Sequence, residues 1–151
     1  MTPKRLYRTL ATAEAVTWTL LIVGLLLKYV TETTEVVVRI GGGVHGFVFL
    51  AYCAVTIVVA VDRSWTFGRL AAGLAAAFVP YLTVPFERSV ERAGLLPGSW
   101  RLRTQRPASL VERPVALALR SPVLAGLVTL AVLAAVFSGL LALGPPTQWA
   151  G

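Results

Sequence analysis

The chain has 151 residues, of which 56% are hydrophobic and 14% are charged, and its formal net charge is +7. A soluble domain typically has about 25% charged residues. Residues 40–61 contain no Asp, Glu, Lys or Arg, and their ionisable groups are His45, the Cys53 thiol and the Tyr52 phenol. About 20 helical residues cross a hydrocarbon core of about 30 Å. The composition predicts a membrane protein and excludes an ordinary soluble enzyme, a disordered tail and a free DNA-binding module.

The first half of the chain contains two predicted membrane helices. An apolar segment at 10–27 follows Lys4, Arg5 and Arg8. It is long for a signal-peptide core and no cleavage site follows it, so we expect a retained transmembrane helix. After a polar loop at 28–39, the second apolar segment covers 40–61.

Two further apolar segments lie at 70–86 and 122–143. The third is short and contains Pro80 and Pro85, so it either spans the membrane or forms a kinked or re-entrant element. The fourth begins at Pro122, a position that helices tolerate. We therefore predict an all-α polytopic membrane protein, a small bundle of four transmembrane helices. Its predicted parts are a membrane domain at 1–92, an Arg-rich loop at 93–121, the last helix, and a tail at 144–151.

The basic residues support two conflicting orientations. If all four segments cross, Lys and Arg divide five against nine, and the positive-inside rule places the N-terminus outside. If 70–86 does not cross, they divide twelve against two, and the N-terminus and the Arg-rich loop share the cytoplasmic side. We favour four crossings, and the orientation stays open.

Ionisable side chains inside apolar helices are costly and need an explanation. Glu14 is either a ligand for a proton, a cation or a small molecule, or a carboxyl group hydrogen-bonded within the bundle. His45 is either a titratable group lining a cavity or a histidine that holds two helices together. With helices at 10–27 and 40–61, the two side chains differ in depth by roughly 15 Å. A direct pair is therefore not expected, and Lys28 and Tyr29 are better placed to meet His45.

Small residues repeat at helical spacing in two segments. Gly42-x-x-x-Gly46 and Gly73-x-x-x-Ala77 are patterns that let two membrane helices approach closely. They predict helix packing, either within the chain or in a homo-oligomer.

The Arg-rich loop is either a solvated connection, a lipid headgroup site or a docking surface for an acidic partner. Interleaved Trp100 fits interface anchoring better than base stacking, so we expect contact with the lipid bilayer and no nucleic acid. No catalytic motif and no Cys/His spacing for a metal is present, and we expect no enzyme activity, metal or cofactor. The residues predicted to contact lipid headgroups are Arg88, Arg92, Arg101, Arg103 and Arg106.

A string of spaced residues over about 8–92 resembles a small bacterial integral membrane family that is classed as a domain of unknown function and has a His-Gly pair as its signature. The string comprises Glu14-Ala-Val-x-Trp18, Leu27-Lys28-Tyr29, Val38-Arg39-x-x-Gly-x-Val-His45-Gly46, Phe49, Tyr52, Trp65, Pro80 and Pro85-Phe86-Glu87-Arg88. The resemblance implies a three-segment fold and no known activity. The positions that it marks as signature residues are Glu14, Lys28, Tyr29, His45, Gly46 and Tyr52.

These observations favour an accessory or structural subunit of the bacterial inner membrane that packs with another membrane protein or with itself. The alternative is a small binding or transport protein in which Glu14 and His45 line a polar cavity for a proton, a cation or a small ligand.

Overall fold

The computed structural model describes residues 1–143 and contains only helices over that range, which confirms the predicted all-α class. The predicted tail at 144–151 lies outside the described residues. The elements are α1 (Pro3–Tyr29), α2 (Val36–Asp62), α3 (Phe67–Ala75), the 3-10 helix η1 (Ala76–Phe78), α4 (Thr83–Arg92), α5 (Glu112–Arg120) and α6 (Pro122–Leu143).

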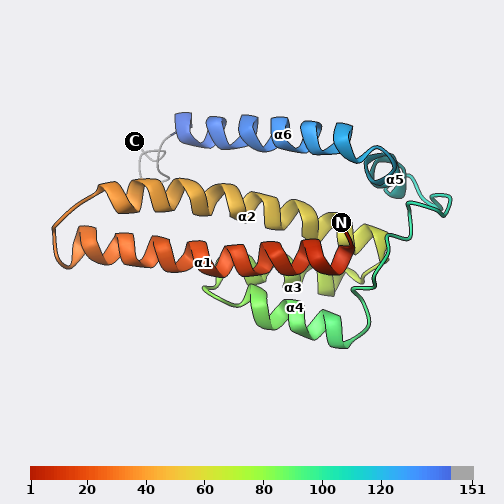
Figure 1. Cartoon of the computed structure of the whole chain (residues 1–151), viewed down its shortest axis with the longest axis horizontal. Helices are drawn as coiled ribbons and strands as arrows, with labels where there is room; N and C mark the ends of the chain where they lie inside the picture. The colour runs from red at the N-terminus through yellow and green to blue at the C-terminus, as the bar shows by residue number, and fades with distance from the viewer. Residues whose placement is uncertain (144–151) are drawn as a thin grey trace.

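The helices α1 and α2 form a long antiparallel hairpin (Figure 1). Each has 27 residues and is long and apolar enough to cross a membrane. α1 begins at Pro3, where the missing N–H is no loss, and the Thr2 side chain caps it by accepting a hydrogen bond from the Arg5 backbone N–H. Both helices continue past the predicted bounds, because hydropathy marks the part of a helix that lies in hydrocarbon and not where the helix ends.

The predicted third span at 70–86 is not one helix. α3 and η1 end at Phe78, the chain turns at 79–82 with a positive φ of 67° at Tyr81, and α4 returns beside α1. Pro85 lies in the first turn of α4, where its missing N–H breaks no helical hydrogen bond. The twelve residues of α3 and η1 rise only about 18 Å. With α4 they form a short helical hairpin that packs against the N-terminal half of α1 and the C-terminal half of α2 (Figure 1).

The expected count of four spans therefore needs correction for the described residues. By length and composition, α1 and α2 each make one candidate span. A third is available if α5 and α6, which meet at an angle of 117°, act together. α6 lies along α2 on the side away from α3 and α4 (Figure 1).

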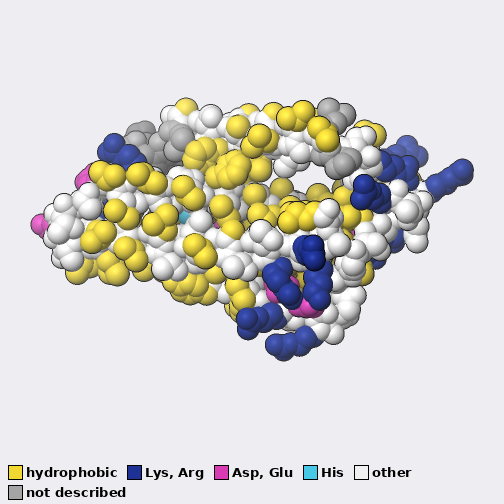
Figure 2. Space-filling view, in the orientation of Figure 1, with side chains coloured by type: hydrophobic (Ala, Val, Ile, Leu, Met, Phe, Trp, Pro, Cys, Tyr) yellow, Lys and Arg dark blue, Asp and Glu magenta, His cyan; other side chains and the backbone are white. Residues whose placement is uncertain are grey.

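The basic segments gather at one end of the hairpin. Lys4 bonds Glu91 at 2.6 Å, Arg8 bonds Glu87 at 3.1 Å, and the Trp100 indole N–H donates to the Met1 carbonyl at 2.9 Å. These contacts place the N-terminus, α4 and the Arg-rich loop together, and Figure 2 shows most Lys and Arg on that half of the molecule. Of the fourteen basic residues, only Lys28 and Arg39 belong to the other end of the hairpin.

Candidate functional site

Glu14 lies inside the helical hairpin as a carboxyl group without a hydrogen-bond partner. It is the twelfth residue of α1, its exposed fraction is 0%, and neither carboxylate oxygen has a partner among the described residues. The nearest basic atom is Nδ1 of His45 on α2, 3.7 Å from Glu14 Oε2. The two ionisable residues singled out from the sequence therefore face each other.

The expectation that Glu14 and His45 stay apart was wrong, because it rested on the wrong pairing register. The connecting loop is only 30–35, so Gly24 meets Val38, and Thr17 meets His45. The predicted loop at 28–39 would pair residue 27 with residue 40, which is a register about five residues, or roughly 7.5 Å, away from the observed one.

Lys28 and Tyr29 do not meet His45. Lys28 Nζ lies 3.4 Å from Glu35 and 5.1 Å from the ring centroid of Tyr29, at the loop end of the hairpin. Tyr29 itself is 67% exposed. The prediction that these residues contact the histidine was therefore wrong, and they form a separate group at the loop end of the hairpin.

His45 is held by a short chain of polar groups. The Thr17 hydroxyl lies 3.0 Å from the Glu14 carbonyl oxygen and 3.2 Å from His45 Nδ1. A hydroxyl has one hydrogen, so when Thr17 donates it to the carbonyl, Nδ1–H must donate to Thr17. The Trp18 ring lies against the imidazole with 4.5 Å between centroids. These contacts fix the ring with Nδ1 directed toward α1.

A second buried polar cluster continues along the same helix faces. The hydroxyls of Tyr7 and Tyr52 are 2.9 Å apart, Thr56 donates to Tyr7 at 3.3 Å, and Tyr52 lies 3.2 Å from the Gly73 carbonyl oxygen. The signature position Tyr52 thus binds α1 and α3 together. The sequence reasoning named Thr17 as a possible partner of Glu14 but missed Tyr7 and Thr56. A signal was present, since Tyr7 precedes Glu14, and His45 precedes Tyr52, by seven residues each, which is one face of two helical turns.

Only some of the glycines in the predicted small-residue patterns lie close to another helix. An added Cβ at Gly42 would meet nothing nearer than Leu21 at 3.8 Å, and one at Gly46 would lie 3.4 Å from Phe137 of α6. Gly73 is tighter, with Phe86 and Thr56 at 3.0 Å, and the Ala77 carbonyl accepts the Trp18 indole N–H at 3.3 Å. The closest approach occurs at Gly24, which the pattern did not select and where an added Cβ would lie 2.7 Å from the Val38 backbone.

Comparison with known proteins identifies the family to which the membrane domain belongs. Residues 4–92 match the family described as Domain of unknown function (DUF3817). The chain belongs to this family. It is also 43% identical over 94 residues to the Streptomyces coelicolor protein named "Putative membrane protein SCO5905". The matched segment is 62% of this chain but only 11% of that relative. No solved structure matches the chain significantly.

The DUF3817 domain thus comprises α1 to α4 and holds every residue of the Glu14 and Tyr52 clusters. α5 and α6 lie beyond the matched residues. Over the part of the chain that the structure describes, no three His, Cys, Asp or Glu side chains come together as metal ligands. Glu14 and His45 offer one carboxyl group and one imidazole, and both groups can bind and exchange protons.

The Arg-rich segment is tied to the DUF3817 domain by a buried carboxylate. Asp62, with an exposed fraction of 0%, accepts hydrogen bonds from the backbone N–H groups of Arg101 and Leu102 at 3.2 and 2.9 Å. The Arg101 guanidinium donates to the Asp62 carbonyl at 2.6 Å and to Glu112 at 2.5 Å. Arg101 was expected at lipid headgroups, but this side chain is engaged within the fold.

The other predicted headgroup residues are differently placed. Arg103 and Arg106 are exposed on the loop. Arg88 and Arg92 line a polar cleft of about 440 Å³ together with Arg8, Glu87 and Glu91. Their contact with lipid stays a prediction.

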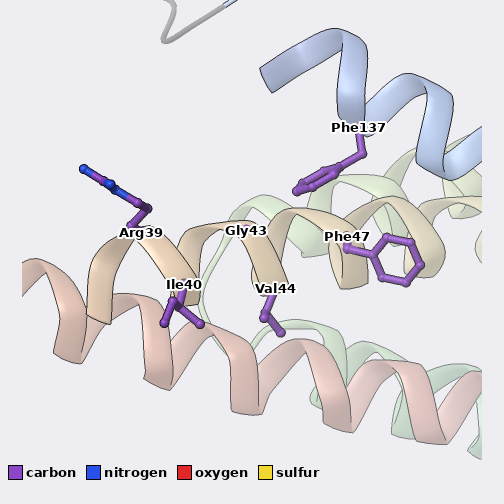
Figure 3. A pocket seen from close by; sticks show the side chains of 6 residues that line it. All are labelled: Arg39, Ile40, Gly43, Val44, Phe47 and Phe137. Carbon is purple, nitrogen blue, oxygen red and sulfur yellow. The ribbon is translucent and has the colours of Figure 1, made fainter. Parts of the chain in front are cut away.

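An apolar groove separates α6 from α2. Its volume is about 530 Å³, and it is lined by Arg39, Ile40, Gly43, Val44, Phe47 and Phe137. In Figure 3 the Phe137 ring reaches from α6 toward Gly43, while Arg39 points away from the other lining side chains. Apart from that guanidinium, the walls offer only apolar contacts, so the groove is no site for acid–base chemistry.

Proposed function

We propose that the chain is an accessory subunit of the bacterial inner membrane, in which the DUF3817 domain is a folded module that packs with another membrane protein and catalyses no reaction. The observation that carries this proposal is the length comparison. The domain makes up 11% of the Streptomyces relative, which is named as a membrane protein. A segment that recurs within another, longer membrane protein fits a module that packs with other membrane segments.

The surface of α6 supports the same proposal. Its 22 residues contain no ionisable side chain. Five apolar side chains along it, Leu127, Val128, Leu130, Val132 and Val136, are exposed. A helix that is apolar all round is suited to burial among other membrane helices. We infer that α6 carries the contact with the partner.

The distribution of charge supports one orientation. With α3 and α4 returning to the end from which they start, twelve Lys and Arg lie at one end of the hairpin and two at the other. The positive-inside rule then assigns the N-terminus and the Arg-rich loop to the cytoplasm, and the loop at 30–35 to the opposite side. The conflict between a basic N-terminus and a basic loop disappears in this three-crossing arrangement.

The partner proposal is tested on the full chain, tagged and purified from its native membranes in mild detergent. Native mass spectrometry of the complex should give one membrane protein partner at a fixed stoichiometry. A Val128→Trp variant on α6 should lose the partner, whereas Val16→Trp, on the exposed side of α1, should keep it. Recovery of a monomer or of a homodimer alone would contradict the proposal.

The orientation is tested by labelling with a membrane-impermeant thiol reagent in a Cys53→Ala background. A cysteine at Thr33 should react from outside the cell, and a cysteine at Gln105 should react only after the membrane is opened. The reverse pattern would contradict the assignment. Both positions are exposed, so their reactivity reports the side of the membrane.

A further inference from the structure

The Glu14 carboxyl group is unlike the other buried carboxyl groups of the described chain. Asp62 accepts two backbone N–H donors, Glu87 accepts from Arg8, and Glu112 accepts from Arg101. Glu14 is equally buried and accepts from none. A carboxylate anion in hydrocarbon without a donor is strongly disfavoured, so this carboxyl group needs a proton of its own or a cation beside it.

Among the described residues, His45 is the basic side chain within 4 Å of the Glu14 carboxyl group. Around it, α1 contributes the Thr17 hydroxyl, and α2 contributes Phe49 and, further along the same face, the Cys53 thiol. η1 contributes the backbone of Ala77, and α4 contributes the Thr83 hydroxyl, which bonds the Ala11 carbonyl. α6 has no ionisable side chain. The nearest cation along α1, Arg8, is bound by Glu87 and Glu91.

We propose that Glu14 and His45 form a proton-binding site inside the membrane that holds one proton between them. With that proton the pair has no net charge, either as a carboxylic acid beside a neutral imidazole or as a carboxylate beside an imidazolium. Losing the proton leaves a net negative charge in the hairpin, and adding another leaves a net positive one. Both charged states are opposed by the cost of burial, so the site has one favoured proton count.

The groups around the Glu14–His45 pair indicate the end of the hairpin from which its proton exchanges. Toward the basic end, the same helix faces carry the hydroxyls of Tyr7, Tyr52 and Thr56. Toward the loop at 30–35, the hairpin closes through apolar and backbone contacts, with Gly41 against Leu20 and Gly24 against Val38. Protons move along hydrogen-bonding groups and not through apolar contacts, so exchange is expected from the basic end.

The test is infrared difference spectroscopy of the full chain in lipid nanodiscs, titrated over the pH range in which it stays folded. The wild type should show the C=O band of one buried carboxylic acid, shifted in D₂O. Glu14→Gln, which keeps the shape and neutrality of the protonated acid, should abolish the band entirely. The matched control is Glu87→Gln, which removes a buried carboxylate that has an arginine partner and should leave the band intact.

His45 is tested by the same titration. A His45→Gln variant should keep the Glu14 band but change the proton affinity about tenfold or more, which is a shift of one pH unit or more in the midpoint. The proposal is overturned if Glu14→Gln leaves the carboxylic acid band in place. It is equally overturned if His45→Gln titrates like the wild type, since the proton is then not shared. Neither result bears on whether α6 binds a partner.

Discussion

Different interactions hold the two halves of the α1–α2 hairpin together. The basic half, residues 3–17 and 45–62, contains nearly all the fully buried side chains, among them Tyr7, Tyr52 and Val59. The loop half, residues 18–29 and 36–44, buries only two residues, Gly24 and Gly41. Its large side chains, such as Leu26 and Ile40, are 51% and 59% exposed.

The difference follows from what covers each half. α3, η1, α4 and the Arg-rich segment add a further layer over the basic half, so it packs around a core of aromatic and polar side chains. The loop half lacks this layer and exposes apolar side chains that suit lipid, which is as apolar as leucine and gives no hydrophobic drive for helix association. Close backbone contact at glycine is then the remaining way to hold two helices together. The polar site lies in the half where protein, and not lipid, surrounds it.

The largest effect is expected from Asp62→Ala, which detaches the Arg-rich segment from the basic half. The change leaves the N–H groups of Arg101 and Leu102 and the Arg63 guanidinium without their buried acceptor. Removing one partner from a buried charged pair lowers the free energy of unfolding by about 3 kcal/mol. Reversible unfolding in mixed micelles measures this loss.

The matched control for Asp62 is an ion pair in the loop half. Glu35→Ala removes the exposed partner of Lys28 and should change the free energy of unfolding by less than about 1 kcal/mol. Equal effects of the two substitutions would contradict the contrast between the halves.

Gly24→Ala should break the contact on which the loop half depends. The added Cβ would lie 2.7 Å from the backbone of Val38, so the helices must separate. Overpacking of this kind costs about 1–3 kcal/mol, against a gain of about 1 kcal/mol in helix propensity. We expect a net loss of up to about 2 kcal/mol in the same unfolding assay.

Gly42→Ala is the control on the neighbouring face, where the added Cβ finds Leu21 at 3.8 Å. It should leave stability unchanged or raise it slightly. If Gly24→Ala and Gly42→Ala change the free energy of unfolding by the same amount, close contact at glycine does not hold the loop half together.

Tyr52→Phe removes one hydroxyl from the core of the basic half. Tyr7 then loses one partner and the Gly73 carbonyl loses its bond from Tyr52, with no change in apolar packing. A loss of about 1 kcal/mol is expected. Tyr81→Phe, whose hydroxyl meets Thr19 on an exposed surface, should show no measurable loss, and a comparable loss there would argue against a special role for the buried cluster.

The sequence was sufficient for the class of fold and for two of the buried ionisable residues, Glu14 and His45, but not for the buried carboxylates of Asp62, Glu87 and Glu112. Runs of apolar residues identify membrane helices directly, and Glu14 and His45 stand out because charges in hydrocarbon are rare. Their contact could not be predicted, since pairing in an antiparallel hairpin depends on where the loop begins and ends. An error of a few residues at the helix ends accounts for about half of the predicted separation of the two side chains.

The third segment shows a different limit. Its hydropathy is that of a span, and the two prolines signal only a possible interruption. The turn at 79–82 and the return of α4 depend on long-range contacts, such as Thr83 to Ala11 and Glu87 to Arg8. In the same way, the close approach at Gly24 could not be distinguished from the open position of Gly42, because both are glycines in apolar helices.

The smallest effect concerns the ion pairs that close the basic end. Hydrogen bonding from Lys4, together with Arg8, lowers the pKa of Glu91 below its ordinary value of 4.5. A lowered pKa in the folded state means that this contribution to stability is present above pH 4.5 and is lost as the pH falls through the lowered pKa. Acid unfolding should therefore begin with the separation of α4 from α1 at this end.

The acid limb of a stability–pH profile measures the contribution of Glu91. Glu91→Gln should flatten that limb slightly and leave stability at neutral pH almost unchanged, because exposed ion pairs contribute little. Glu32→Gln, in the loop half, changes an exposed glutamate that forms no ion pair among the described residues and should leave the limb as it is. If Glu91→Gln also leaves it unchanged, the basic end is held by Asp62 and the aromatic core alone, and its surface charges serve orientation in the membrane and not stability.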